Sequence, residues 1–126
     1  MWLLDTEHYS LRRFDKPPAH YAILSHVWRH SVNEPEQTFS DIKSIRSSKN
    51  LSGKLRHCCK HARQQGIHWV WVDTCCIDRT NSVELSEAIN RMFEWYSNAT
   101  VCYAFLYDVN ASENPAQRES DRKSVV

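Results

Sequence analysis

Short apolar runs in this sequence are followed by side chains that can bind a ligand or move a proton. An imidazole titrates near neutral pH, a carboxylate can stabilise developing positive charge, and an indole offers a flat apolar surface. If the runs are parallel strands, their carboxyl ends share the edge at which open α/β sheets bind ligands. The candidate ligand pocket at that edge consists of Ser25, His26, Trp28, Asp73, Asp78 and Asp108.

Structural roles for these residues stay open beside the functional ones. An aspartate at a strand end commonly accepts hydrogen bonds in a backbone turn, so Asp73 can serve the fold and no ligand. His26 can be a structural histidine whose hydrogen bonds are satisfied, and Trp28 can belong to the core. The strand-end pocket is therefore a hypothesis that rests on where these residues stand relative to the predicted strands.

A metal centre and a cysteine nucleophile are both disfavoured. The segment 57–61 contains two histidines and two cysteines, but Cys58 would pack in the apolar stripe of a helix and no Cys-x-x-Cys motif completes a tetrahedral set. The pair Cys75-Cys76 is the one possible completion. Neither of its thiols immediately precedes a helix or has a sequence-near base that would lower its pKa. We therefore expect no metal.

Glycines and charges exclude further classes of function. Gly53 and Gly66 are the only glycines, so no glycine-rich loop for a Rossmann dinucleotide or a P-loop nucleotide exists. Sixteen Lys and Arg against fifteen Asp and Glu give a net charge of +1, with no clustered basic run, so we expect no nucleic-acid partner. The segment 1–5 reads neither as a signal peptide nor as a membrane span. Of the five cysteines, four form two adjacent pairs and one is left over, so we expect a reducing cytoplasmic location. No membrane partner is expected either.

Hydrophobic periodicity predicts the elements that position these residues. Two short strands, 2–4 and 11–14, form an N-terminal β-hairpin, and strands at 21–25, 69–73 and 101–107 alternate with helices at 38–42, 51–62 and 81–96. This order predicts a three-layer α/β fold with a mostly parallel sheet and helices on both faces. The buried stripe expected on the last helix comprises Leu85, Ile89, Met92, Phe93 and Tyr96.

Several segments of the sequence resemble those of a known protein family. Residues 21–28 (YAILSHVW) are similar to the opening strand of the fungal heterokaryon-incompatibility (HET) domain, and residues 69–78 (WVWVDTCCID) are similar to its second block. The segment 82–104 completes the resemblance, which covers about 2–109. It implies self/non-self recognition that leads to growth arrest or cell death, and a fold related to the Toll/interleukin-1 receptor (TIR) domain and flavodoxin. It also implies NAD as a possible substrate, since many TIR domains cleave NAD.

The chain departs from the family pattern at two places. Complete HET domains follow the third strand with a Gly-Trp-Thr-x-Gln-Glu-Leu block, which corresponds to the TIR helix that carries the catalytic glutamate, and no such block follows Val109. Neither Glu113 nor Glu119 takes over that role, and Arg29 stands where the family usually has glycine. We therefore expect the N-terminal portion of a HET domain at 1–109 and a polar, disordered tail at 110–126.

Three functions follow from the resemblance. The first is an incompatibility module that assembles with itself or with other HET-type domains, the second is an NAD glycohydrolase of the TIR type, and the third is an inactive truncated remnant that binds a full-length partner. An unpaired strand edge after 101–107 predicts marginal stability or self-association. The candidate assembly surface consists of Arg79, Glu84, Glu87 and Arg91.

Overall fold

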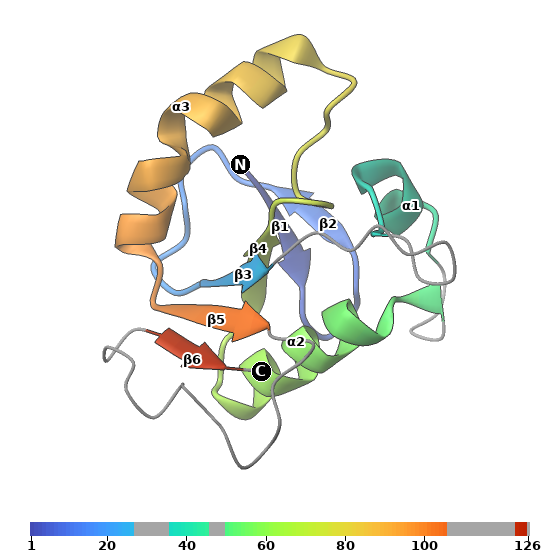
Figure 1. The fold of residues 1–126 in the computed structure, drawn as a ribbon, viewed down its shortest axis with the longest axis vertical. Coiled ribbons are helices and arrows are strands. Elements are labelled where there is room, and N and C mark those ends of the chain that lie inside the picture. Colours follow the sequence, from blue (N-terminus) through green and yellow to red (C-terminus); the bar gives the residue numbers. More distant parts are fainter. Residues whose placement is uncertain (27–35, 46–49, 106–122, 126) are drawn as a thin grey trace.

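Six strands and three helices make up the part of the chain that the computed structural model describes, which is residues 1–26, 36–45, 50–105 and 123–125 (Figure 1). The strands are β1 (Trp2–Asp5), β2 (Leu11–Arg13), β3 (Ala22–His26), β4 (Trp69–Val72), β5 (Val101–Phe105) and β6 (Lys123–Val125). The helices are α1 (Phe39–Lys43), α2 (Gly53–Gln64) and α3 (Ser82–Asn98).

The strands form one mixed sheet in the order β2-β1-β4-β3-β5-β6. Strand β3 pairs in parallel with β4 and with β5, and β6 pairs in parallel with β5. Strand β1 pairs antiparallel with both β2 and β4. The predicted α/β class and N-terminal hairpin are therefore confirmed. The expectation of an unpaired edge beside β5 is wrong, because β6 pairs with it.

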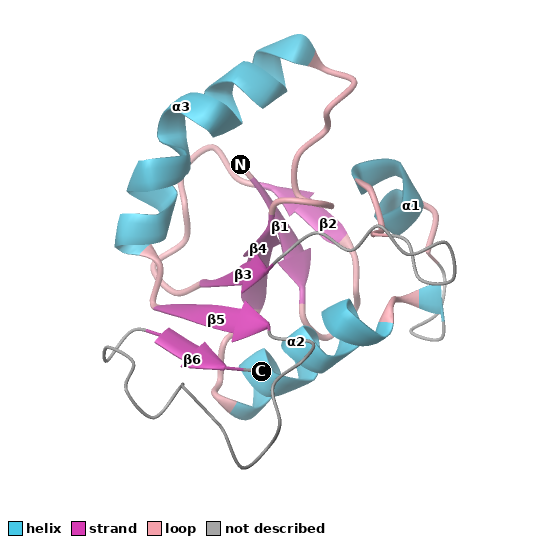
Figure 2. Cartoon of the chain, viewed as in Figure 1, coloured by secondary structure: helices cyan, strands magenta, loops and turns pink. Residues whose placement is uncertain are grey.

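Helices α2 and α3 lie on opposite sides of the sheet, which gives the three layers (Figure 2). Trp71 of β4 packs edge to face against Trp95 of α3, with the ring centroids 5.7 Å apart. Tyr103 of β5 packs against His61 of α2 at 4.9 Å. Because side chains alternate along a strand, Val72 points to the face opposite Trp71, which is the face of its register neighbours Leu24 and Tyr103.

Helix α2 begins and ends with recognisable capping groups. The Ser52 hydroxyl accepts a hydrogen bond from the Leu55 amide, and Gly66 adopts φ 76° two residues beyond the helix. A glycine with positive φ just after a helix is a common way to stop it. Three residues later β4 begins, so the cap directs the chain into the sheet.

Helix α3 buries a face that coincides only in part with the predicted stripe: Leu85, Met92 and Tyr96 are half-buried and pack against the core as expected. Its fully buried side chains are Ala88 and Trp95, whereas Ile89 and Phe93 are 63% and 86% exposed. Ala88 and Trp95 are seven residues apart and therefore share a face that points to the sheet. The expected stripe is wrong at Ile89 and Phe93, because the apolar residues of this helix span more than one face and the indole of Trp95 determines which face is buried.

The last described strand belongs to the segment that the sequence assigned to a polar tail. Lys123–Val125 form β6, with Cys102 opposite Lys123 and Ala104 opposite Val125. Residues 110–122 and 126 of that segment lie outside the described residues. None of the helices that the structure describes is long and apolar enough to cross a lipid bilayer.

Candidate functional site

The carboxyl ends of β3, β4 and β5 meet at one edge of the sheet. Leu24 is in register with Val72 and Tyr103, so Ser25 at the end of β3 and Asp73 just after β4 follow neighbouring positions. His26 ends β3 in register with Phe105, although its side chain is outside the description. The structure therefore brings these strand ends together as the sequence predicted, while Trp28 and Asp108 lie outside the described residues.

The strand order reverses at β3. The chain passes from β3 through α1 and α2 to β4 on one side of it, and then through α3, on the opposite face, to β5 on the other side (Figure 1). Ligands of open α/β sheets bind in the crevice outside the carboxyl ends of the strands at such a switch point, which here is between β3 and β5. Ser25 lies near the end of β3 and Asp73 just after β4, and both are half-buried.

Asp73 has a structural role, and its neighbour Thr74 carries a buried polar group. The Asp73 carbonyl accepts a hydrogen bond of 3.1 Å from the Arg79 guanidinium, which closes the loop after β4. Burial, then Cys102, then the negative charge of Asp73 raise the pKa of Tyr96 to about 12, so its hydroxyl stays protonated. The buried hydroxyl of Thr74 has no hydrogen-bond partner within the described part of the chain. Sequence reasoning missed Thr74 and Tyr96, whose signal was closeness to Asp73 in the fold.

Asp78 stands apart from these groups and closes a turn. Its Oδ1 accepts hydrogen bonds from the Thr80 amide at 3.1 Å and the Thr80 hydroxyl at 2.6 Å. It also lines a hollow of about 20 Å³ beside Trp2 and Glu84. Such a space holds about one water molecule, so this side of Asp78 has no room for an organic ligand.

The cysteines after β4 are buried. Cys75 and Cys76 are 0% and 3% exposed, and their sulfur atoms are 4.0 Å apart. The hydrogen bond between the two thiols, together with burial, raises the pKa of Cys75 well above its usual value. A thiol in this state is a poor nucleophile. Within the described ranges, no three His, Cys, Asp or Glu side chains are grouped so that they could hold a metal ion.

The candidate assembly residues lie along the start and middle of α3 and the loop before it. Glu87 and Arg91 are exposed and 4.0 Å apart, and Arg91 also lies 3.9 Å from Glu94. Glu84 is half-buried and accepts a hydrogen bond of 3.1 Å from the indole of Trp2, so it helps to hold the helix on the sheet. The exposed apolar side chains Ile89 and Phe93 on the same helix were missed as surface residues.

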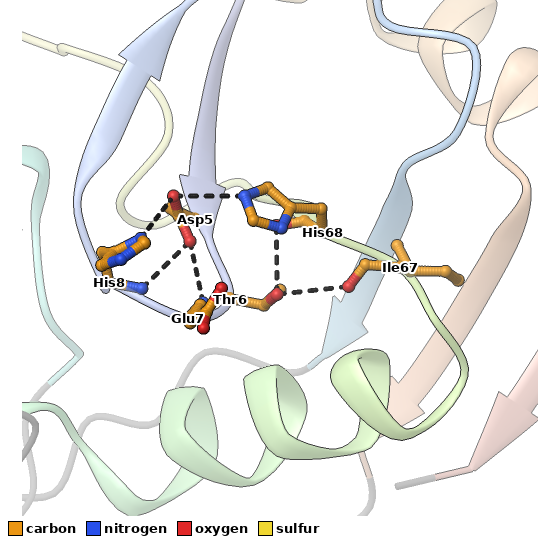
Figure 3. A network of polar contacts seen from close by, with 6 residues as sticks. All are labelled: Asp5, Thr6, Glu7, His8, Ile67 and His68. Carbon is orange, nitrogen blue, oxygen red and sulfur yellow. Dashed lines mark hydrogen bonds and ion pairs between the residues drawn. The ribbon is translucent and has the colours of Figure 1, made fainter.

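A buried polar network at the β1–β2 turn was also missed by sequence reasoning (Figure 3). Asp5 accepts hydrogen bonds from the amides of Glu7 and His8 at 2.8 and 3.0 Å, and it lies 3.4 Å from His68. Burial raises the pKa of Asp5, but the hydrogen bonds from His8 and Glu7 and the charge of His68 outweigh it and lower the pKa overall. Asp5 and Thr6 thus tie the turn to the start of β4.

Comparison with known proteins gives a family for this chain. The family model described as "Heterokaryon incompatibility protein (HET)" matches residues 21–125. The chain is 44% identical over 108 residues to "Vegetative incompatibility protein HET-E-1" of Podospora anserina, a match that covers 85% of this chain and 8% of that protein. No solved structure matches the chain significantly, so the expected likeness to TIR and flavodoxin-like folds stays a prediction.

The region matched by the family model contains strands β3, β4 and β5 and the whole of α3. The similarity to the Podospora protein extends over most of the chain. The chain therefore belongs to the fungal heterokaryon-incompatibility (HET) family.

Proposed function

We propose that this chain is an incompatibility signalling module that works by assembling with like domains through the exposed face of α3. The supporting observation is the unusual exposure of apolar side chains on that helix: Val83, Ile89 and Phe93 are 74%, 63% and 86% exposed. They are the only large hydrophobic side chains so exposed in the described part of the molecule. Exposed apolar groups gathered on one element commonly mark an interaction site.

The position of the apolar pair favours a second copy as the partner. Ile89 and Phe93 are four residues apart and therefore neighbours on the helix surface. Glu87, Arg91 and Glu94 pair with one another on another side of the helix and leave the apolar pair clear. When two such helices meet antiparallel about a two-fold axis, the apolar pair of each copy is buried against that of the other. An exposed surface that is complementary to itself suits homotypic assembly.

Substitution of the apolar pair tests the assembly. The double variant Ile89→Ser with Phe93→Ser should shift the purified chain from oligomer to monomer in size-exclusion chromatography with light scattering. Induced expression in a fungal cell should then no longer arrest growth. The matched control is Gln64→Ser, an exposed position on α2 across the sheet, which should leave both readouts unchanged. A parent chain that stays monomeric at high concentration, or a double variant that still assembles and arrests growth, would overturn the proposal.

NAD cleavage at the carboxyl ends of the parallel strands is the second candidate function. It is supported by the half-buried Asp73 and by the buried Thr74 hydroxyl just after β4, which has no partner among the described residues. A carboxylate beside the ribose would stabilise the positive charge that develops at the anomeric carbon as nicotinamide leaves, and a hydroxyl would orient the ligand. This role for Asp73 requires that its side chain reach the crevice, in addition to the Arg79 contact of its carbonyl.

Nicotinamide release from NAD, measured by chromatography, separates the two functions. The parent chain should release nicotinamide, and Asp73→Asn should reduce the rate at least about 100-fold if the carboxylate stabilises the transition state. Ile89→Ser with Phe93→Ser serves as the comparison, since it should abolish assembly alone. No release from the parent chain would reject the enzymatic function and leave the assembly proposal standing.

A further inference from the structure

Helix α2 carries positive charge on its outer face without any acidic residue. Its sequence GKLRHCCKHARQ contains three exposed permanent cations and two histidines. The exposed cations are Arg56, Lys60 and Arg63, which occupy one side of the helix at i, i+4 and i+7. Like charges at this spacing repel each other, so an uncompensated row of this kind costs stability in the absence of a bound anion.

These cations line a hollow and do not simply project into solvent. Arg56, His57, Lys60 and Arg63 form one wall of a cavity of about 350 Å³. Tyr9, from the β1–β2 turn, forms the other. A volume of this size lies within the range of small-molecule sites.

Backbone conformation and a hydrogen bond fix the position of Tyr9 at the hollow. This residue adopts φ 57°, an unusual conformation for a tyrosine, and its amide donates to the Asp5 carbonyl at 2.9 Å. The Asp5 carboxylate accepts hydrogen bonds from the amides of Glu7 and His8, and among the described residues it pairs with His8 and His68 and not with the cations of α2. The guanidinium of Arg63 lies over the Tyr9 ring at 5.7 Å from its centroid. The turn therefore holds an aromatic ring and a cation together at one end of the hollow.

The cations of α2 differ in their partners. Lys54 is buried and forms an ion pair with Glu36. Arg56 and Lys60, by comparison, have no acidic partner among the residues that the structure describes, so a bound anion would supply one.

We propose that the hollow between α2 and Tyr9 is a binding site for a small molecule that carries a diphosphate or similar compact polyphosphate group. Each phosphoryl group brings up to about two negative charges near neutral pH, so two adjacent groups match three permanent cations and His57. Arg56 and Arg63 can each donate paired hydrogen bonds to phosphate oxygens, and Lys60 supplies a point charge between them. This site is separate from the α3 surface and does not depend on the assembly proposed above.

The extent of the patch favours a small ligand over a nucleic acid. Residues 56 to 63 span about 10 Å along the helix axis, and they supply three permanent cations. DNA-binding proteins commonly make about six to ten phosphate contacts, which this surface cannot provide. Two phosphoryl groups held side by side fit its length.

Calorimetric titration of the 126-residue chain with inorganic pyrophosphate tests the site. We expect saturable binding of one pyrophosphate per chain that weakens as salt is added. The double variant Arg56→Gln with Lys60→Gln should bind at least about tenfold more weakly, because it removes two charge-assisted contacts. The control Lys16→Gln removes an exposed cation from a loop outside the hollow and should change the affinity by less than about twofold. The melting temperature of each variant verifies that it is folded.

Parallel titrations identify which class of phosphate-bearing molecule binds. They use a nucleoside diphosphate, vesicles that contain a phosphatidylinositol bisphosphate, and a short single-stranded RNA. Pyrophosphate and the nucleoside diphosphate should bind, and both should lose affinity in the double variant. Binding to vesicles or RNA without binding to pyrophosphate would overturn the proposal, as would equal affinities for the parent and the folded double variant.

Discussion

The two long helices cover opposite faces of the same sheet and differ in how they are attached. Of the twelve residues of α2, five are buried, whereas α3 buries two of its seventeen. The buried apolar side chains of α2 are Leu55, Ala62 and two cysteines, whereas the one large side chain that α3 buries is the indole of Trp95. The helix with fewer buried side chains is the one with exposed apolar residues. Stability is therefore concentrated on the α2 face, and α3 has surface left for a partner.

Truncation of one buried side chain on each helix should produce the largest effect. Trp95→Ala should destabilise the chain by about 3–5 kcal/mol and Leu55→Ala by about 2–5 kcal/mol, since both side chains are buried. The two variants should also differ in which helix loses protection from hydrogen exchange. Hydrogen exchange should show the amides of α3 opening independently in Trp95→Ala, while α2 stays protected in Leu55→Ala through its four other buried residues.

Chemical denaturation provides the free energies of unfolding for both variants. Equal protection of α3 in the parent and in Trp95→Ala would show that the indole is not its main attachment, and the contrast between the helices would then fail.

Removal of the Asp5 carboxylate should loosen the β1–β2 turn. Asp5→Ala loses the acceptor for two amides and should cost about 1–3 kcal/mol at neutral pH. The folded pKa of Asp5 is lowered, so its contribution is complete above the unfolded value of about 3.9 and disappears as the pH falls through the folded pKa. The acid limb of the stability profile should therefore be shallower in Asp5→Ala. A parallel profile for parent and variant below about pH 4 would contradict this.

A smaller effect is expected at the end of α2. Gly66→Ala places a Cβ at φ 76°, where nothing within 4 Å would clash with it, so the cost is backbone strain of about 1 kcal/mol. Gly66→Asn should cost less, since asparagine tolerates this conformation better. Thermal melts of the two variants provide the comparison. Equal losses for alanine and asparagine would mean that backbone conformation is not the cause.

The smallest effect should come from the exposed face of α3. Phe93→Ser removes a side chain that is 86% exposed, so the stability of the monomer should change by less than about 0.5 kcal/mol. The measurement is a urea titration at a protein concentration low enough to prevent association. A loss as large as that of Trp95→Ala would show that Phe93 packs within the molecule and would remove the basis for an assembly surface on α3.

Local pattern was sufficient to predict most elements, because strong apolar runs such as 69–72 and caps such as Asn81 and Gly66 act within a few residues. The face of α3 was not predictable, since its apolar residues outnumber the positions that one sheet face can cover. Strand β6 was missed because Lys123–Val125 has little hydrophobic signal and gains its structure from pairing with β5. The same limit applies to Tyr9, whose importance comes from Arg63, a residue distant in sequence.

Tyr21 gives α3 a fixed end. Its buried hydroxyl donates to the Trp95 carbonyl at 2.6 Å, and its own carbonyl accepts from the Thr100 amide at 2.8 Å. The far end of the helix is held by the Trp2–Glu84 hydrogen bond. A helix of seventeen residues is about 25 Å long, so a tilt of about 10° about Tyr21 would move its first turn by about 4 Å. A partner that tilts α3 about its Tyr21 contact would therefore strain the Trp2–Glu84 hydrogen bond at the other end of the helix.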